Sequence, residues 1–342
     1  MHRRFGVEQE QFILHEDGTP PSHDEMDRLY ELLQKQSYGV CAADARGRVL
    51  AVERSTESGS LVVTNDCYTH VLEVAFPPFD NLDVFRRVAL EEFSLIGAAL
   101  QELGLAVRPG AALNPPHEMS ARPKATDPNG ARLNAVLTRA AIDHPLFHPA
   151  LPACIAATQV SLNIPDAEAI RKLSSFYQFE PLIPLLFGNS PEFNGVRGWC
   201  VRPLAWMANF PSSYSLLGVP DPVPGSLSEY EQMRQSSKSR DYSFVSIRSA
   251  DRVEFRSACS QDSLDDILWL IRFRLAVDRA CERDTSPPRD NPRARFIAVC
   301  TTGPGPWCEE LFQRLFEVDP SLQELWRKRI SGEPGGVSPR TP

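Results

Sequence analysis

The spacing of apolar residues predicts helices and strands in mixed order along the chain. Apolar residues at every third or fourth position predict helices over residues 24–36, 83–103 and 264–281. Alternation of apolar and polar residues predicts strands over residues 157–164 and 252–256. These are the most regular segments, and they set the expected architecture.

Shorter segments complete the predicted order. We expect strands over 6–12, on both sides of a turn at 44–47, over 61–66 and over 70–76, the last ended by Pro77 and Pro78. The less regular predictions are a surface loop over 109–129, a helix over 130–142, a helical stretch over 166–187 divided by Pro181 and Pro184, a long excursion over 203–241, a break over 284–293, a last helical region over 307–330 and a disordered tail over 332–342.

The order of these segments indicates the fold class. Strands often follow one another directly, with long helices between the groups, which favours an antiparallel β-sheet with helices packed on one face, an α+β architecture. The other face of the sheet carries Glu, Asp, Gln and Asn. Burying such a face is costly, and a water-filled active site with bound metal, on a concave sheet surface, would explain it.

Composition narrows the function classes. A hydrophobic content of 42% in 342 residues fits a globular core, in one large domain or two small ones. The net charge of −8, without a long basic run, argues against a nucleic-acid partner. No apolar stretch reaches the roughly 20 residues of a membrane span, and no apolar signal region follows the N-terminus. We therefore expect no membrane partner and a cytoplasmic location.

The cysteines and histidines indicate neither disulfides nor zinc. The eight cysteines include no Cys-x-x-Cys pair, and the seven histidines do not cluster with them. Reduced, buried thiols are the expected state.

Acidic residues at strand spacing are the first candidates for chemistry. Glu8 and Glu10 lie two residues apart in a predicted strand, so their side chains share a face. Adjacent carboxylates repel each other, and a bound divalent cation would relieve the repulsion. A short polar edge strand that faces water is the alternative.

Three further elements carry acidic or polar side chains. Asp66 and Glu73 are seven residues apart, so a bend must lie between them if both serve one site; alternatively, Asp66 is only a turn residue. Glu254 and Arg256 share a face of their strand, where the arginine can be a structural ion-pair partner.

The polar side of strand 157–164 is the last of these elements. Gln159, Ser161 and Asn163 share one face of it, which can also be simply solvated.

Together these residues suit a magnesium-dependent nucleotide site. Carboxylates with neutral oxygens favour Mg²⁺ or Mn²⁺ over Zn²⁺, and a neighbouring arginine favours a phosphate group. The sequence contains neither a Walker-type Gly-x-x-x-x-Gly-Lys nor a Rossmann fingerprint. A site for ATP would therefore lack a glycine-rich phosphate loop.

The motifs resemble, in order, those of the glutamate–cysteine ligase family, whose fold is glutamine-synthetase-like. The segment 6–10, Gly-Val-Glu-Gln-Glu, resembles that family's first metal-binding strand. The remaining matches are 64–66 with Glu73, Thr158 to Asn163, 188–191, Gly195, Arg202 with Trp206 four residues later, Arg132 before Gln159, and 253–256. The resemblance extends over residues 5–280.

The resemblance implies an ATP-dependent carboxylate–amine ligase in a single catalytic domain, residues 1–331. ATP would phosphorylate a glutamate side chain, and an amine of an amino acid or peptide would attack the acyl phosphate. The resemblance assigns metal ligation to Glu8, Glu10, Asp66, Glu73 and Glu254, phosphoryl contacts to Arg132 and Arg256, and substrate contacts to Gln159, Asn163, Arg202 and Trp206. Arg202 and Trp206 have alternative readings as a surface charge and a packing residue.

Three other functions remain open from the sequence. The chain can be a ligase of a specialised pathway with a different acceptor amine, or a non-catalytic relative that kept the fold. The non-catalytic alternative is suggested because the family usually carries a further strand and a basic segment before the last motif, and residues 236–251 are expected to be too short to hold them. A phosphotransferase that acts on a guanidine is the third.

Overall fold

The computed structural model of the chain describes residues 3–66, 68–113, 144–210, 214–236, 241–248, 251–283 and 291–331. The predicted helix over 130–142, Arg132, most of the predicted loop over 109–129 and the predicted tail lie outside these residues. In the described part of the chain, no helix is both long enough and apolar enough to cross a membrane.

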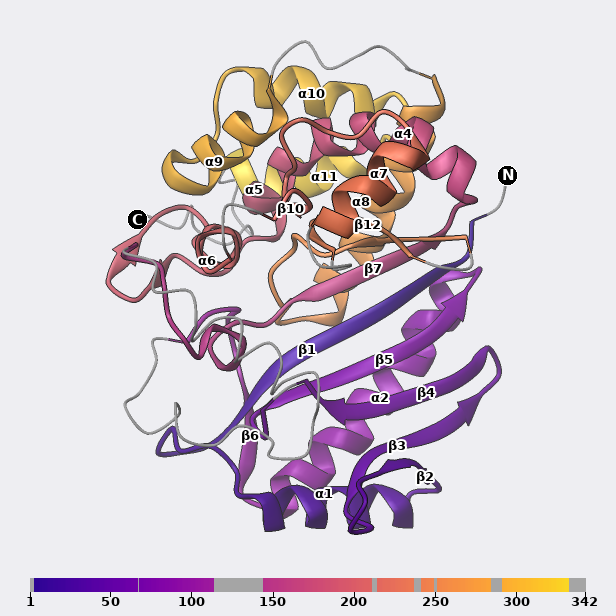
Figure 1. Ribbon diagram of the computed structural model, residues 1–342. Coiled ribbons are helices and arrows are strands. Elements are labelled where there is room, and N and C mark those ends of the chain that lie inside the picture. Colours follow the sequence, from indigo (N-terminus) through magenta and orange to yellow (C-terminus); the bar gives the residue numbers. More distant parts are fainter. Residues whose placement is uncertain are drawn as a thin grey trace.

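Nine strands of the described chain form one antiparallel sheet. In Figure 1, β1 (Phe5–His15) runs through the sheet between β7 and β5. The strand order is β12-β13-β7-β1-β5-β4-β3-β2, and β6 pairs with the end of β1. The strands are β2 (Gly39–Ala43), β3 (Val49–Thr56), β4 (Gly59–Asn65), β5 (Val71–Phe79), β6 (Leu105–Arg108), β7 (Thr158–Asn163), β12 (Val245–Arg248) and β13 (Arg252–Phe255). Because β1 lies between β5 and β7, its acidic residues have neighbours on both sides.

Helices cover one face of this sheet. α2 (Leu82–Glu102) packs on β5 and β6, and α1 (His23–Lys35) packs on β3. α8 (Leu264–Arg283) packs on β7, and α4 (Asp166–Phe179) packs on β12. In Figure 1, α2 passes behind β4 and β5. The apolar side chains of the strands point to these helices and form the main core.

The remaining elements extend this core and border the open face of the sheet. They are η2 (Leu151–Ala153), η3 (Glu180–Leu182), α5 (Ile183–Phe187), α6 (Arg202–Ala208), α7 (Leu227–Ser236), α9 (Pro292–Thr302), α10 (Trp307–Phe316), α11 (Leu322–Trp326), the π-turn η4 (Arg327–Ser331), and the strand pairs β8 (Glu192–Phe193) with β9 (Val196–Arg197) and β10 (Leu217–Gly218) with β11 (Tyr242–Ser243).

A second, smaller cluster of buried apolar residues lies on the face that the main helices leave open. It includes Phe12 and Val71, which follow the same alternation as Glu10 and Glu73. The cluster joins α6 and η2 to this end of the sheet. It therefore provides an apolar wall beside the polar sheet face.

The predicted α+β class, with an antiparallel sheet and helices on one face, is confirmed. The prediction that Pro77 and Pro78 end their strand is wrong, because β5 continues to Phe79. The register of β1 shifts between Phe5 and Val7, opposite this stretch, and the β4 pairing of β5 stops at Ala75. The prolines therefore lie at a bulge, where the missing N–H groups cost little.

Two other predictions are corrected. Residues 236–251 do hold a strand, β12, which pairs with β13 across a connection of three residues. The predicted excursion over 203–241 contains two helices, α6 and α7. Helix α9 was not predicted either, because its apolar residues show little helical spacing.

Candidate active site

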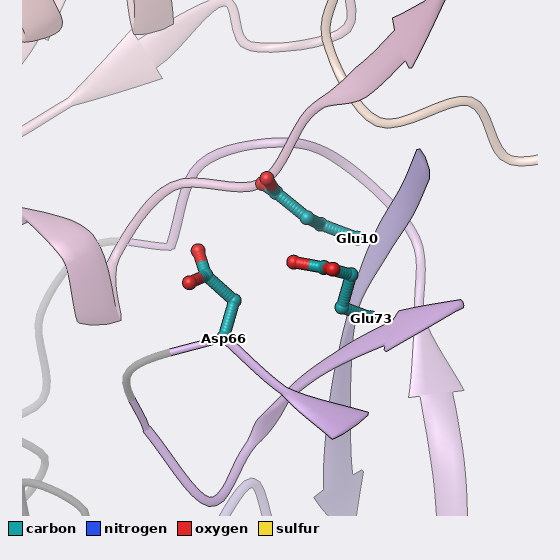
Figure 2. A group of neighbouring side chains, drawn as sticks. All are labelled: Glu10, Asp66 and Glu73. Atoms are coloured by element: carbon teal, nitrogen blue, oxygen red, sulfur yellow. The ribbon is translucent and has the colours of Figure 1, made fainter. Parts of the chain in front are cut away.

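Three carboxylates from three parts of the sheet meet on its polar face. Glu10 of β1 lies opposite Glu73 of β5 in the strand register, and Asp66 follows the end of β4. One side-chain oxygen from each of the three lies within 4.8 Å of the other two. Figure 2 shows the three carboxylates around one common space.

The turn between β4 and β5 makes this meeting possible. The backbone N–H of Asp66 donates to the carbonyl of Val71 at 2.9 Å, so the chain reverses before β5 begins. The reversal is the bend that the spacing of seven residues required, and it brings Asp66 beside Glu73. Asp66 is therefore a turn residue whose carboxylate also borders the site.

Burial and mutual repulsion favour the protonated forms of this cluster. Burial, followed by the charge of Asp66, raises the pKa of Glu10 to about 7. Burial, followed by the charges of Asp66 and Glu10, raises the pKa of Glu73 to about 9. Among the described residues, neither glutamate forms an ion pair with Lys or Arg. Carboxylate oxygens that crowd one another in this way fit Mg²⁺ or Mn²⁺.

Hydrogen bonds fix the orientation of Glu10. The backbone N–H of Ala157 and the side-chain amide of Gln159 each donate to its carboxylate at 2.7 Å. Gln159 in turn accepts a hydrogen bond from Arg256 Nε at 3.2 Å. Gln159 of β7 thus connects Glu10 on β1 to Arg256, which directly follows β13.

The other half of the site has the opposite electrostatic character. The carboxylate of Glu254 lies 2.8 Å from Arg248, 3.2 Å from Arg256 and 3.7 Å from Arg252. Burial would raise the pKa of Glu254, but Arg256 and Arg248 outweigh burial, and the pKa is lowered. The protein itself thus compensates this carboxylate, in contrast to Glu10 and Glu73.

Glu8 lies between the two halves. Its neighbours in the register are Ala75 on β5 and Gln159 on β7. Burial, followed by the charge of Glu254, raises its pKa. It is therefore placed to face a cation shared with either half.

Helix α6 contributes Arg202 and Trp206, which lie one turn apart and so share a helix face. Arg202 is buried, and its Nη1 donates to the carbonyls of Arg256 and Ser257 at 3.2 and 3.4 Å. Within the described residues its Nε has no hydrogen-bond partner. The indole N–H of Trp206 donates to the carbonyl of Tyr242 at 3.1 Å, and Arg256 lies over its ring at 6.0 Å.

These residues enclose a pocket of about 500 Å³. Nine of the predicted site residues line it: Glu8, Glu10, Asp66, Glu73, Gln159, Arg202, Trp206, Glu254 and Arg256. A larger groove of about 650 Å³ lies at the start of α2, but its charged residues include the paired Arg279 and Asp319. The smaller pocket is therefore the better candidate for chemistry.

One predicted residue is not described by the structure, and another does not line the pocket. Arg132 lies outside the described residues. Asn163 shares its sheet face with Gln159, but it lies four residues further along β7, about 13 Å away. Its side chain is exposed, and its Oδ1 accepts a hydrogen bond from the backbone of Arg4. Asn163 therefore lies outside the described pocket.

The sequence reasoning missed several residues that line the pocket. Arg252 lies two residues before Glu254, so strand alternation alone could have placed it on the same face. Arg248 had no such signal, because β12 was not expected. Tyr242, Phe244, Pro152 and Ile155 form the apolar wall, which only the tertiary structure reveals.

Comparisons with known proteins identify the family and the fold of the chain. The model of glutamate-cysteine ligase family 2 matches residues 4–249. No curated protein matches the sequence. A glutamate–cysteine ligase from Francisella tularensis, solved in complex with AMP, superimposes with a TM-score of 0.62 at 11% identity, over 97% of this chain and 83% of that one.

Two further solved structures share the fold. A bifunctional glutathione synthetase from Pasteurella multocida gives a TM-score of 0.60 at 14% identity, over 97% of this chain and 47% of that one. The complex of the prokaryotic ubiquitin-like protein Pup with its ligase PafA gives a TM-score of 0.51 at 11% identity, over 100% of this chain and 60% of that one. At these identities the likeness shows the glutamine-synthetase-like fold. The family match covers most of the sequence, and the chain belongs to glutamate-cysteine ligase family 2.

Proposed function

We propose that this protein is an ATP-dependent carboxylate–amine ligase that activates the side-chain carboxylate of glutamate. One observation carries the proposal: a cluster of three carboxylates adjoins an arginine-rich strand in the same pocket. Such a pocket can hold metal-bound phosphates at one end and phosphoryl oxygens against guanidinium groups at the other. The family match and the AMP complex of a structural neighbour support a nucleotide as the ligand.

Glu10, Asp66 and Glu73 would hold Mg²⁺, with Glu8 beside them. When bound, Mg²⁺ would screen the charges of the phosphates from the surrounding carboxylates. Glu254 was predicted as a further metal ligand; its ion pairs also suit a second role, the positioning of Arg248 and Arg256.

The arginines would divide the work between phosphate and substrate. Arg256, together with the predicted Arg132, would contact phosphoryl oxygens, and Gln159 would keep Arg256 oriented. Arg202 would bind a substrate carboxylate, because its buried Nε is without a partner among the described residues. Trp206 would form one side of the substrate space. Asn163 has no place in this proposal.

The proposed reaction has two steps that balance. A glutamate side-chain carboxylate oxygen attacks the γ-phosphorus of ATP, the bond to the β-γ bridging oxygen breaks, and ADP leaves. The acceptor amine then attacks the acyl carbon, the C–O bond to phosphate breaks, and the amine loses a proton as the amide forms. Placement and charge neutralisation supply most of the rate in phosphoryl transfer, which this pocket is built to provide.

A hydroxylamine assay tests the donor without knowledge of the natural acceptor. We expect wild-type protein with ATP, Mg²⁺, L-glutamate and hydroxylamine to release ADP and form the hydroxamate. Glu10→Gln should abolish both products, and Ser175→Ala, on the buried side of α4, should change neither. The proposal is wrong if no donor carboxylate supports ADP release. Mass spectrometry of products with cysteine, other amino acids and peptides then identifies the acceptor.

The acceptor is the open part of this proposal. Strand β12 supplies the segment whose apparent loss suggested a non-catalytic relative, so that alternative loses its motive. PafA is the ligase of the protein Pup, and because it shares the fold, the assay should also include peptides and proteins as acceptors. A phosphorylated guanidine in place of an amide would instead indicate the phosphotransferase.

A further inference from the structure

A buried ion pair lies behind the pocket, between the break after α4 and the middle of α8. Glu180 of η3 and Arg274 of α8 are fully buried, and both terminal nitrogens of Arg274 donate to the Glu180 carboxylate. The Arg274 guanidinium also stacks on Phe255, with 4.4 Å between Cζ and the ring centre. Neither charged residue is among those that line the described pocket. Their influence on a ligand would have to pass through other residues.

Ser257 connects this pair to the strand that carries Glu254 and Arg256. Its hydroxyl donates to Glu180 Oε2 and accepts from Arg274 Nη2 at 2.9 Å. Both functions of the hydroxyl are thus used, and the side chain is buried. The backbone just after β13 is therefore held from the helical side of the sheet.

The same backbone segment holds Arg202 from the pocket side. Arg202 Nη1 donates to the carbonyls of both Arg256 and Ser257. The backbone N–H of Arg202 donates to Ser190 Oγ at 3.0 Å. Because the guanidinium is rigid and planar, fixing Nη1 also fixes the direction of Nε. A shift of the Ser257 carbonyl would therefore turn the donor edge of Arg202.

We propose that Glu180 and Arg274, through Ser257, are positioning residues that fix the guanidinium of Arg202 for a carboxylate substrate. The inference rests on the proposed function, because it takes Arg202 as the group that binds that carboxylate. It assigns the buried pair to ligand affinity, although the pair lies outside the pocket.

A stability role alone explains the pair poorly. Desolvation of two charges offsets most of their attraction, so buried ion pairs are weak contributors to folding. A second buried pair, Lys172 with Asp278 at 2.7 Å, already ties α4 to α8 and does not reach the pocket. What distinguishes Glu180 and Arg274 is their contact with Ser257, which lies next to Arg256.

The test compares Ser257→Ala with Ser175→Ala, a second buried serine that lies on α4 outside the pocket. In the hydroxamate assay, Ser257→Ala should raise KM for L-glutamate about tenfold, leave KM for ATP within about twofold, and change kcat little. Ser175→Ala should leave both KM values unchanged. Glu180→Gln, which keeps shape and an acceptor oxygen, should fall between wild type and Ser257→Ala.

A double-mutant cycle with Arg202→Lys tests the path itself. If Ser257 acts through Arg202, Ser257→Ala should add little to KM for L-glutamate once Arg202 is Lys. Equal effects of Ser257→Ala in both backgrounds would overturn the proposal, as would an unchanged KM in the single variant.

A crystal structure of the Ser257→Ala variant tests the positioning role without an activity measurement. We expect Arg202 Nη1 to leave the carbonyls of Arg256 and Ser257, and an unmoved Arg202 would refute the positioning role. Absence of turnover in wild-type protein would overturn the proposed function instead, and the crystallographic arm would still decide the inference.

Discussion

Replacement of Glu73 by glutamine should stabilise the protein when no metal is present. Glu73 is largely buried and faces Glu10 and Asp66, and its pKa is raised to about 9 from an ordinary value of 4.5. At pH 7 the unfolded chain has released the proton of Glu73, whereas the folded protein retains it. Folding must then take up a proton, which costs free energy, and glutamine avoids this cost because it is always neutral.

The magnitude follows from the width of the pH window. Each pH unit between the unfolded and folded pKa values costs about 1.4 kcal/mol, so the cost at pH 7 is roughly 3 kcal/mol. The stabilisation by Glu73→Gln should vanish near pH 4.5, where the unfolded chain also begins to hold the proton. It should increase as the pH rises toward 9.

Urea unfolding in EDTA at several pH values between 4.5 and 9 measures this difference. Glu53→Gln, on β3 outside the pocket, is the matched control and should change the free energy of unfolding little. Addition of Mg²⁺ should reverse the order, because the wild-type carboxylate then gains a cation that glutamine cannot bind as well. If Glu73→Gln is less stable than wild type at pH 7 in EDTA, the carboxylates do not crowd one another as described.

Three further outcomes follow from the same geometry. Mg²⁺ should bind more tightly as the pH rises from 6 to 9, because protons on Glu10 and Glu73, with pKa values of about 7 and 9, compete with the metal. Calorimetry in buffers of different ionisation enthalpy should detect the released protons, and a pH-independent affinity would exclude these two ligands. Glu254→Gln should destabilise the protein by about 2 kcal/mol at pH 7, because Arg248 loses a buried charged partner. The difference in stability should fade in acid as the wild-type carboxylate takes up a proton, which its lowered pKa delays. Equal urea midpoints at pH 7 would count against this prediction. Asn163→Ala should leave both KM values in the hydroxamate assay within about twofold, since its side chain lies outside the pocket, and a larger change in KM for glutamate would contradict its placement.

Strand alternation made much of the candidate site predictable. Glu8 and Glu10 share a face because side chains alternate along a strand, and the same rule places Glu254 beside Arg256. Alternation cannot say which residues of different strands lie opposite each other. The pairing of Glu10 with Glu73 depends on the register of β1 and β5, which the turn after Asp66 and the core packing determine.

The residues that lie outside the pocket and those that sequence reasoning missed also have physical explanations. Asn163 was placed on the correct face of its strand, but alternation contains no information about distance along the strand to the pocket. Arg248 was missed because a four-residue strand is too short to show a period, and its pairing with β13 supplies the stability that its own sequence lacks. Glu180 and Arg274 belong to helical segments, where a charged residue usually indicates a solvated face.

The half of the pocket around Glu254 and the half around Glu10 and Glu73 differ in the source of the positive charge that balances their carboxylates. This difference suggests how a phosphate chain would be oriented in the pocket. Around Glu254 the protein provides arginines, so that half is charge-balanced before any ligand arrives. Glu10 and Glu73 form no direct ion pair with Lys or Arg within the described residues, and their raised pKa values show that negative charge there would be stabilised by a bound metal. Phosphates should therefore lie between the metal end and the arginine end. At pH 7 without metal, Glu73→Gln is expected to raise the free energy of unfolding and Glu254→Gln to lower it. If both substitutions change the free energy of unfolding in the same direction, the two halves of the pocket do not differ in this way.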